Sequence, residues 1–516
     1  MGLIPYKNEP GLDWSDEANV KAMRAALEEV GGSLGKSYPL IIGGKRVETD
    51  GEIVSVNPAD PSQVVGRVAA ATKREADMAL ETARKAFESW SRTAPEARAR
   101  ILLRAGASMR RRRFELLAWH VHEGAPPWAE ADAQLAEAID FLEYYAREML
   151  RLKDGVEIYS VPGEESRYFY QPMGVGVVIA PWNFPTAILT GMSSAAVVTG
   201  NTIIMKPSEY TSVLGAKVAE IFEEAGAPPG VVNFLPGYGG EIGDYLVQDP
   251  RTRFISFTGS MKTGLKINEL AAKQIENQRW IKRVIAEMGG KDAMIIDDSA
   301  DLDAAAQDIV ISAYGYAGQK CSAASRAIIH EVVYDEVLQR VIEKAKALKV
   351  GVPESVDVGM GPVISEPQFE KISSYIDVGK GEGERLLGED PGDPEKGYFV
   401  SPTVFEVDPE ARVAQEEIFG PVLSVIRARD FEDALAIAND NPYGLTGGVY
   451  SRSRDHLELA RREFNAGNIY FNRKITGALV GVQPFGGFGM SGTDSKAGGP
   501  DYLPLHMLAK TVVERF

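Results

Sequence analysis

Short apolar runs alternate with amphipathic segments over residues 174–287. The runs have the length of strands and cover residues 175–180, 202–206, 231–235, 254–257 and 284–287. Between them, residues 213–225 carry apolar side chains on one stripe of a helix, and Gly226 follows as a stop signal. Because strands that alternate with helices pair in parallel, this pattern predicts a doubly wound α/β sheet. Ligands bind such sheets at the carboxyl ends of the strands, so the residues after each run are the first candidates for function.

The rest of the chain adds other patterns. Helical periodicity covers about 15–35 and 72–150, strand-like segments around a Pro-Gly turn cover 151–170, a second α/β pattern covers 292–472, glycine-rich loops cover 477–499, and a terminal strand covers 511–516. In the second α/β pattern, residues 333–348 and 431–439 are predicted to be helices and 422–426 a strand. We therefore expect two α/β units and a hairpin that leaves them.

Composition narrows the classes of protein. The chain has 516 residues, of which 44% are hydrophobic, and a net charge of −17. The apolar share excludes a disordered chain, and the length is typical of roughly three domains. The negative charge opposes binding to nucleic acid or to an anionic membrane. The longest apolar stretch, 174–200, is broken by Pro181, Asn183 and Pro185, so neither half could span a bilayer. We therefore expect a soluble, cytoplasmic protein without nucleic-acid or membrane partners.

Cys321 is the only cysteine, which excludes an intrachain disulfide and suits a reducing compartment. Any thiol chemistry therefore depends on this residue. A single cysteine in a helical setting is commonly an inert, small apolar residue. Here Gln319, Lys320 and Ser322 flank it, and polar neighbours with an adjacent cation favour access and a thiolate. Both interpretations stay open at this point.

The residues after the first two runs could bind an oxyanion and a ribose. After 175–180 comes Pro181-Trp182-Asn183-Phe184-Pro185, in which two prolines fix the backbone around an amide that can donate to an oxyanion. After 202–206 comes Lys206-Pro207-Ser208-Glu209, whose ammonium and carboxylate suit ribose hydroxyls. A carboxylate here would repel a 2′-phosphate and so favour NAD over NADP. The alternatives are a plain turn in the first case and a surface charge pair in the second.

The later runs end in candidates for a phosphate site and a general base. Thr258-Gly259-Ser260 follows 254–257 at a helix start, where free N–H groups suit a phosphate. Neither this segment nor Gly237-Tyr238-Gly239-Gly240 matches the G-x-G-x-x-G fingerprint, so each turn alone is weak evidence. At the end of the last run, Glu287 is followed by Met288-Gly289-Gly290, and a carboxylate beside two glycines can swing as a base for water must. The alternative is an ordinary acid at a strand end.

No metal site is predicted. Residues 297–303 have the acidic composition of a calcium loop but lack glycine at the sixth position and glutamate at the twelfth. They are typical of an acidic, capped helix start. Of the five histidines, only His120 and His122 are close in sequence, and no cysteine accompanies them.

Six ordered motifs together resemble the NAD(P)-dependent aldehyde dehydrogenase family, over roughly residues 35–516. They are Pro181-Trp182-Asn183-Phe184, Lys206-Pro207-Ser208-Glu209, Phe257-Thr258-Gly259-Ser260, Glu287-Met288-Gly289-Gly290, Gly318-Gln319-Lys320-Cys321 and Glu417-Ile418-Phe419-Gly420-Pro421. The family commonly has leucine where this chain has Met288, a swap of similar volume. The resemblance implies an aldehyde dehydrogenase-like α/β fold: a Rossmann-type parallel-sheet NAD domain, an α/β catalytic domain and a small β oligomerisation element. The implied boundaries are 1–152 with 172–287, 288–490, and 153–171 with 491–516, respectively.

The resemblance also implies the chemistry. Cys321 would attack the aldehyde carbon, Asn183 and the Cys321 backbone N–H would hold the oxyanion, and Glu287 would activate the water that hydrolyses the thioester. The cofactor would be NAD, with no metal. The implied cofactor-binding residues are Ala180, Pro181, Trp182, Lys206, Ser208, Glu209, Gly239, Gly259, Ser260, Thr263, Met288, Gly289, Glu417 and Phe419.

Within the family, residues 318–326 and 472–481 most resemble members that oxidise L-glutamate γ-semialdehyde, the open form of Δ1-pyrroline-5-carboxylate, to L-glutamate in proline degradation. The second segment is similar to a loop that anchors the substrate carboxylate far from the thiol. The implied substrate-binding residues are Glu123, Phe184, Lys320, Ser322, Gly477, Ala478 and Phe485. One departure concerns Glu123: the family commonly has Gly-Lys soon after it within a helix, and here Gly124-Ala125-Pro126-Pro127 breaks the helix.

Two alternatives stand beside this function. The substrate could be another small aldehyde, or the chain could be a non-catalytic structural relative, although the presence of Cys321 and Glu287 opposes the latter. The segments 151–170 and 495–516 resemble an oligomerisation hairpin and clasp, which implies a homodimer or a higher homo-oligomer. The sequence contains no proline dehydrogenase domain, so such a partner would be a separate protein.

Overall fold

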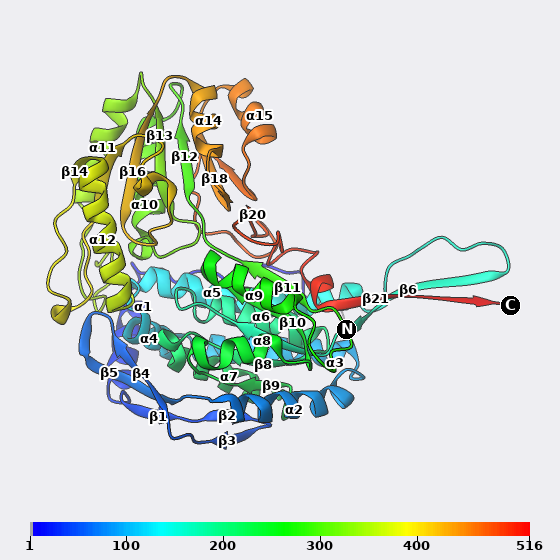
Figure 1. Cartoon of the computed structure of the whole chain (residues 1–516). Helices are drawn as coiled ribbons and strands as arrows, with labels where there is room; N and C mark the ends of the chain where they lie inside the picture. The colour runs from blue at the N-terminus through cyan, green and yellow to red at the C-terminus, as the bar shows by residue number, and fades with distance from the viewer. Residues whose placement is uncertain (1–3) are drawn as a thin grey trace.

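The computed structural model describes residues 4–516, and Figure 1 shows two α/β bodies and a projecting ribbon. The sheet of the first body has the order β11-β10-β7-β8-β9-β2-β3. Its parallel strands are β7 (Val175–Ile179), β8 (Thr202–Lys206), β9 (Val232–Phe234), β10 (Thr252–Thr258) and β11 (Arg283–Glu287). Every predicted run thus forms a strand of one parallel sheet, which confirms the predicted α/β class. Two short strands, β2 (Leu40–Ile42) and β3 (Lys45–Val47), extend the sheet beyond β9 in antiparallel pairing.

Helices cover both faces of this sheet. They are α2 (Lys73–Trp90), α3 (Pro95–Arg111), α4 (Arg113–Gly124), α5 (Trp128–Leu152), α6 (Ala187–Val198), α7 (Ser212–Glu224), α8 (Asp244–Gln248) and α9 (Met261–Ala272). Alternate side chains of β8 join different cores: Ile203 and Met205 pack in the core that contains α6 and α7, and Ile204 packs with α2. The strands are therefore buried on both faces, as their continuous apolar runs indicate. The segment 72–150, predicted to be helical, is divided into four helices, and Pro126-Pro127 separates α4 from α5.

The second body is built on a sheet of the order β14-β15-β16-β13-β12-β18-β19. Its strands are β12 (Asp292–Ile296), β13 (Ala324–His330), β14 (Gly383–Leu387), β15 (Thr403–Val407), β16 (Val422–Ala428), β18 (Thr446–Tyr450) and β19 (Asn468–Phe471), all parallel except the edge strand β14. Its helices are α10 (Leu302–Tyr314), α11 (Tyr334–Lys346), α12 (Glu366–Glu382), α13 (Arg412–Gln415), α14 (Phe431–Asn439) and α15 (Arg454–Glu463). The strand predicted at 422–426 and the helices predicted at 333–348 and 431–439 are confirmed as β16, α11 and α14.

The N-terminal part adds a helix and a small sheet to the first body. The helix α1 (Glu17–Gly31), predicted at about 15–35, packs against α4. A three-stranded sheet of the order β1-β5-β4 follows, and the sequence pattern did not define it. Its strands are β1 (Lys36–Tyr38), β4 (Glu52–Asn57) and β5 (Asp60–Ala69).

A two-stranded ribbon projects from the first body, and the C-terminus lies at its tip (Figure 1). It consists of β6 (Glu164–Pro172) and β21 (Met507–Arg515), which pair antiparallel along their whole length. The hairpin predicted over 151–170 is confirmed in outline only: the chain turns at Pro162-Gly163 as predicted, but a single antiparallel bridge, Val156 to Tyr168, joins its two arms. The main partner of β6 is the C-terminal strand, which is longer than predicted.

The glycine-rich region 477–499 is mostly loop, as predicted. Its one short strand in the described chain, β20 (Phe488–Gly489), pairs with β17 (Tyr443–Gly444). Among residues 4–516, no helix combines the length and the apolar character that crossing a membrane requires.

Candidate active site

The two bodies meet at opposite edges of their sheets. Lys206 and Glu287 end β8 and β11, so the first sheet contributes the carboxyl ends of its strands. Cys321 lies just before β13 and Glu417 just before β16, so the second sheet contributes the amino ends. A hydrogen bond of 3.0 Å from Asn183 Nδ2 to the Gln319 carbonyl oxygen joins the two edges. The sequence motifs therefore converge on one site from both sides of this junction.

The loop that carries Cys321 has an unusual backbone. After α10, Tyr316 and Ala317 both have a φ of 53°, and Gly318 has a φ of 67°, so three successive residues are left-handed. The buried Gln319 side chain secures this loop, because its amide oxygen and nitrogen bond to backbone groups at 2.9 and 3.3 Å. Left-handed residues other than glycine are costly and concentrate at functional sites, where the surrounding contacts enforce them.

Asn183 presents a hydrogen-bond donor to this loop. The residue is 4% exposed, and one of its amide N–H groups donates to the Gln319 carbonyl oxygen. The second N–H is left for another acceptor, since an amide nitrogen carries two hydrogens. Together with the backbone N–H of Cys321, it can hold an oxygen atom that gains negative charge.

The surroundings of Cys321 disfavour the thiolate. The thiol is partly exposed, but burial raises its pKa, and the carboxyl groups of Asp292 and Glu287 raise that pKa further. The prediction that Lys320 promotes the thiolate is wrong, because its ammonium is paired with Glu130 Oε1 at 2.7 Å. The resting thiol is therefore protonated at neutral pH and has to lose its proton during any attack on a carbonyl carbon.

Glu287 can change its protonation near neutral pH. Burial raises the pKa of its carboxyl to about 7, against hydrogen bonds from Ser495 that favour the carboxylate. Oε1 accepts from Ser495 N at 3.3 Å and from the Ser495 hydroxyl, whereas Oε2 is buried and has no hydrogen-bond partner within residues 4–516. One oxygen is thus fixed and the other is available, which suits a general base.

At the carboxyl ends of the first sheet lie hydrogen-bond donors that make few hydrogen bonds within the described residues. Lys206 is 4% exposed, and among the described residues its ammonium reaches a single acceptor, the Pro207 carbonyl, at 3.4 Å. Burial lowers the pKa of Lys206, and Glu209 opposes this change. Ser260 caps α9 by accepting from Thr263 N at 3.3 Å, and the N-terminus of this helix attracts anions. These groups fit the ribose and the phosphates of a dinucleotide.

Glu417 and Phe419 reach the site from the second body. Glu417 accepts from Gly290 N at 3.1 Å, and a Cβ on Gly289 would lie 1.9 Å from Glu417 Oε1, so a side chain at residue 289 would displace the Glu417 carboxylate. Burial raises the pKa of Glu417. Phe419 has a φ of 62°, and its ring meets Trp182 edge-on at a centroid distance of 5.4 Å. An acceptor and an aromatic wall thus face the strand ends of the first sheet.

The other candidate cofactor residues lie at these strand ends, in the turns beside them or in the first turns of the helices that follow. They are Ala180, Pro181, Ser208, Gly239, Gly259, Thr263 and Met288. Two of them also have a structural role. The Ser208 hydroxyl accepts from Tyr210 N at 3.3 Å and so shapes its turn, and Met288 packs so closely below α9 that a Cβ on Gly264 would lie 2.4 Å from its sulfur.

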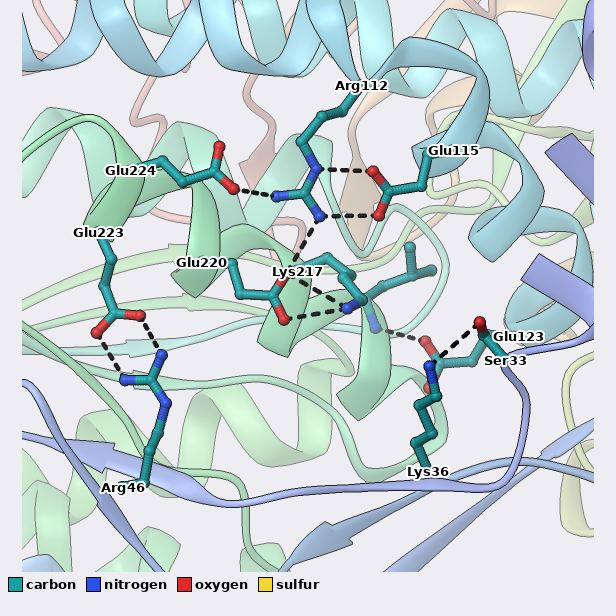
Figure 2. A network of polar contacts seen from close by, with 11 residues as sticks. Ser33, Lys36, Arg46, Arg112, Glu115, Glu123, Lys217, Glu220, Glu223 and Glu224 are labelled. Atoms are coloured by element: carbon teal, nitrogen blue, oxygen red, sulfur yellow. Dashed lines mark hydrogen bonds and ion pairs between the residues drawn. The ribbon is translucent and has the colours of Figure 1, made fainter. Parts of the chain in front are cut away.

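Glu123 does not face the thiol, which contradicts its expected role in the substrate pocket. It is fully buried, and its carboxylate accepts from Val213 N at 2.8 Å, from Leu214 N at 2.7 Å and from the Ser55 hydroxyl at 2.7 Å. Figure 2 shows it near the ion pairs that Arg112 forms with glutamates of α4 and α7. Because it satisfies the first N–H groups of α7, Glu123 stabilises that helix instead of a substrate.

Glu137 of α5 is a further acid whose charge affects the thiol, and the sequence reasoning missed it. Burial raises the pKa of Glu137 to about 8, Asp140 raises it further, and Lys320 opposes the rise. The Glu137 carboxylate is also one of the charges that raise the pKa of Cys321. The signal in the sequence was an acid flanked on both sides by apolar residues of a long helix, which are buried in the structure.

The remaining candidates for the substrate pocket come from three loops. Phe184 and Phe485 are partly buried, and Ser322, next to the nucleophile candidate, is 8% exposed. Gly477 has a φ of 76°, and within residues 4–516 neither its N–H nor that of Ala478 donates to a protein acceptor. Free N–H groups at a left-handed turn suit a carboxylate.

No group of three or more potential metal ligands gathers anywhere in residues 4–516. The acidic segment 297–303 is explained locally. Asp301 caps α10 by accepting from Ala304 N, and Asp297 accepts from the hydroxyls of Ser299 and Ser451. The predicted acidic helix start is thereby confirmed.

Known proteins match this chain over nearly its whole length. The profile of the aldehyde dehydrogenase family matches residues 46–512. A 1-pyrroline-5-carboxylate dehydrogenase of Geobacillus thermodenitrificans is 61% identical over 99% of both chains. The structure of 1-pyrroline-5-carboxylate dehydrogenase from Thermus with bound NAD is 57% identical, with a TM-score of 0.98 and 100% of both chains covered. Proline utilization A from Bdellovibrio bacteriovorus is 44% identical with a TM-score of 0.97; the match covers 99% of this chain and 53% of that one.

Proposed function

The chain belongs to the aldehyde dehydrogenase family, and from that premise we propose that it oxidises L-glutamate γ-semialdehyde to L-glutamate with NAD, in proline degradation. Relatives at 55% to 61% identity over 99% of the chain carry the name 1-pyrroline-5-carboxylate dehydrogenase, and the Thermus structure of that name contains NAD. The structural observation that carries the proposal is the bond from Asn183 to Gln319, which sets an amide donor beside the lone thiol of Cys321.

The residues present fit NAD. Within the described residues, the buried ammonium of Lys206 has no strong hydrogen-bond partner, and the N-terminus of α9 is open to a phosphate. The Glu417 carboxylate lies against Gly289, where any side chain would displace it. When bound, NAD supplies the acceptor for the hydride that leaves the aldehyde carbon.

The first half of the reaction takes place at Cys321. Its Sγ attacks the aldehyde carbon, and the oxyanion that forms receives the second N–H of Asn183 and the backbone N–H of Cys321. The thiol proton has to leave at this step, because burial and nearby carboxylates keep the resting thiol protonated. Because the thiol is partly exposed, its proton passes to solvent water, and Glu287, whose carboxyl has a pKa of about 7, stays available as a carboxylate for the second half.

The second half is a hydrolysis. Once the carbon has been oxidised, Cys321 carries the acyl group as a thioester. Glu287 takes a proton from water, the new C–O bond forms, and the C–S bond breaks with release of the thiolate and the carboxylic product. The unpartnered Oε2 of Glu287 is the atom available for this transfer.

Selection of the semialdehyde depends on groups remote from the thiol. Its α-carboxylate suits the free N–H groups of Gly477 and Ala478 and the Ser322 hydroxyl, and Phe184 and Phe485 flank its aliphatic chain. We add Glu137 in place of Glu123, because its carboxyl, whose pKa burial raises to about 8, would ionise beside the substrate ammonium and pair with it. An uncharged aldehyde brings no ammonium, so this carboxyl would stay protonated and the charged pair would not form.

The domain division expected from the resemblance is also part of the proposal: NAD binding in 1–152 and 172–287, catalysis in 288–490, and oligomerisation in 153–171 and 491–516. The strand orders support it, since each seven-stranded sheet takes all its strands from one of the first two units.

Assembly and location complete the proposal. The ribbon and the loop before it expose apolar side chains, namely Val156, Tyr159, Val161, Val513 and Phe516. Exposed apolar surface of this kind favours a homodimer or a higher homo-oligomer that covers it. We place the protein in the cytoplasm, where a single free thiol stays reduced, and a separate proline dehydrogenase would supply its substrate.

The test is NADH formation by the purified protein with racemic Δ1-pyrroline-5-carboxylate, beside Cys321→Ala and a panel of uncharged aldehydes. We expect the semialdehyde to be preferred and the variant to lose at least about 10⁴-fold in kcat. Turnover of uncharged aldehydes alone would reject the substrate and keep the Cys321 mechanism. Binding of NAD without turnover of any aldehyde would favour a non-catalytic relative.

A further inference from the structure

The N-terminal segment 4–12, called the strap below, lies along α5 without forming a helix or a strand. Backbone groups at both of its ends are held by that helix: Arg147 donates to the Ile4 carbonyl at 3.0 Å, and Leu12 N donates to Asp132 Oδ2 at 2.6 Å. The strap is therefore a fixed part of the first body along the length of α5.

The middle of the strap contacts the candidate anchor loop for the substrate, residues 472–481. The Tyr6 hydroxyl donates to the Val480 carbonyl oxygen at 3.0 Å, and Asn8 Nδ2 donates to the same oxygen at 2.9 Å. The Tyr6 ring also packs on the loop, since a Cβ on Gly481 would lie 3.0 Å from its Cε1. Two side chains of the strap thus hold one peptide group of the loop, close in sequence to the free N–H groups of Gly477 and Ala478.

The strap is itself held at this point by a buried acid of α5. Asp140 Oδ2 accepts from Asn8 Nδ2 at 2.9 Å, and Asp140 Oδ1 accepts from Glu9 N at 2.7 Å. Asp140 is 3% exposed and lies one helical turn after Glu137, an acid whose charge affects the thiol. The strap, the anchor loop and the candidate ammonium-binding residue are therefore tied to the same stretch of one helix.

Directly after its donor residues, the anchor loop is tied to the residues that follow it: Leu479 N donates to Gln483 Oε1 at 2.9 Å, and the Leu479 carbonyl accepts from Val482 N and Gln483 N. Ties to more distant parts of the chain are few. Ile475 N donates to Ser312 Oγ at 3.2 Å, before the donors, and Gly481 N donates to the Gly498 carbonyl at 2.9 Å, after them. Between these points the loop turns through the left-handed Gly477. The strap thus acts on the loop at the Val480 carbonyl, where its two hydrogen bonds fix the orientation of the peptide groups that follow Gly477 and Ala478.

We propose that the strap is a specificity element: Tyr6 and Asn8 are positioning residues that hold the anchor loop so that the N–H groups of Gly477 and Ala478 face the substrate carboxylate. This inference rests on the proposed function, because it assigns the strap to recognition of an acidic aldehyde. Neither residue touches the thiol, so the chemical step is independent of them. Loss of their hydrogen bonds weakens binding of aldehydes that carry a carboxylate and leaves uncharged aldehydes unaffected.

The kinetic test compares Tyr6→Phe, Asn8→Ala and the double variant with Lys7→Ala, an exposed strap residue between them. We expect the KM for the semialdehyde to rise roughly threefold in each single variant and roughly tenfold in the double variant. The kcat, the KM for NAD and the kcat/KM for an uncharged aldehyde such as propanal should stay within about twofold of the unmodified protein. An equal loss for both aldehydes, or an unchanged KM for the semialdehyde, would overturn the proposal.

A second measurement does not depend on the substrate. Hydrogen–deuterium exchange is followed in peptides that cover the anchor loop of the double variant and of Lys7→Ala. The proposal requires faster exchange over 474–481 in the double variant, with the peptides around Cys321 and Glu287 unchanged. Unaltered exchange in the loop would refute the strap's role even if the semialdehyde were not the substrate. A protein that oxidises uncharged aldehydes but not the semialdehyde would instead refute the proposed function.

Discussion

The two seven-stranded sheets follow the same parallel plan but present opposite edges to the site. On the nucleotide side, Lys206 ends β8 and Ser260 follows β10. On the thiol side, Cys321 precedes β13 and Glu417 precedes β16. The rule that ligands bind at the carboxyl ends of parallel strands therefore holds for one side and fails for the other. In a protein of two sheets, the junction between them determines which edges carry the chemistry.

The two sides also differ in charge. The nucleotide side offers a buried ammonium, Lys206, and the N-terminus of α9, both suited to an anionic ligand. The thiol side gathers carboxyl groups, and those of Asp292, Glu287 and Glu417 all raise the pKa of Cys321. The nucleotide side thus suits a ligand with a permanent negative charge. The thiol side keeps Cys321 neutral until its proton is removed.

Backbone regularity separates the sides as well. On the nucleotide side, candidate residues continue directly from strands. On the thiol side, Tyr316, Ala317, Phe419 and Asn472 all have positive φ, from 51° to 62°. Such conformations need support from surrounding contacts, so this side depends more on its neighbours than on its own secondary structure.

The largest effect is expected at Glu287, which ends a strand of the nucleotide side but takes part in the thiol chemistry. Glu287→Gln keeps the shape of the side chain and removes the base, so we expect kcat to fall about 10²- to 10⁴-fold. Because Glu287 would act after the thioester has formed, the first turnover of NADH should survive as a burst in stopped-flow absorbance. A slow steady state without a burst would place Glu287 before oxidation.

The pH dependence follows from the same residue. The pKa of Glu287 is raised to about 7, and the base has to be a carboxylate, so kcat should fall by about tenfold per pH unit as pH drops below 7. The profile of Glu287→Gln should lack this limb. A limb near the ordinary glutamate pKa would show that burial does not control this group in the working enzyme.

A smaller effect is expected where the two sides touch, at Gly289. In Gly289→Ala the new Cβ would lie 1.9 Å from Glu417 Oε1, so the Glu417 carboxylate has to move away from the cofactor. We expect the KM for NAD to rise about ten- to hundredfold, with a loss of stability of about 1–3 kcal/mol. The matched control is Gly381→Ala in α12, where a Cβ meets nothing within 4 Å. Equal KM values for NAD in both variants would remove Glu417 from the cofactor site.

The strands and helices of both sides could be predicted because buried positions appear in the sequence as a regular pattern of apolar residues. Strands covered on both faces appear as continuous apolar runs, and Phe431–Asn439 is a helix at the predicted residues, with Asp430 as its N-cap. The strand-end rule also led to Lys206, Ser260 and Glu287. These residues needed no knowledge of how the two bodies meet.

The remaining features depend on contacts between distant parts of the chain. Cys321 lies before its strand, so the motif resemblance identified it where the strand-end rule could not. The partner of β6 is the C-terminal strand β21, which no local pattern indicates. Glu123 was assigned to the pocket by the family resemblance, and the helix break at Pro126-Pro127 gave no information on which way α4 faces.

The exchange of Glu123 for Glu137 can be tested directly with a matched pair. Glu123→Gln places an amide N–H₂ among the donors of Val213, Leu214 and Ser55, so we expect a loss of about 1–3 kcal/mol in unfolding free energy and unchanged kinetics. Glu137→Gln replaces a carboxyl that is mostly protonated in the free protein with an amide that cannot ionise beside the substrate, so stability should hold while kcat/KM for the semialdehyde falls about tenfold. Urea unfolding and steady-state kinetics of both variants decide the matter; the reverse assignment of effects would restore Glu123 to the pocket.

The smallest effect tests whether the nucleotide side also selects its dinucleotide. Glu209 lies beside the buried Lys206 and would repel a 2′-phosphate, so Glu209→Gln should raise kcat/KM with NADP by about tenfold and change that with NAD less. The control is Glu384→Gln, which removes the same charge from an exposed position of β14, far from these strand ends in sequence. Because both variants have the same net charge, an equal change in the NADP-to-NAD ratio would reflect the overall field of the protein. A change confined to Glu209→Gln would show that this one carboxylate after β8 sets the preference for NAD over NADP. The nucleotide side would then determine which cofactor reaches the thiol side.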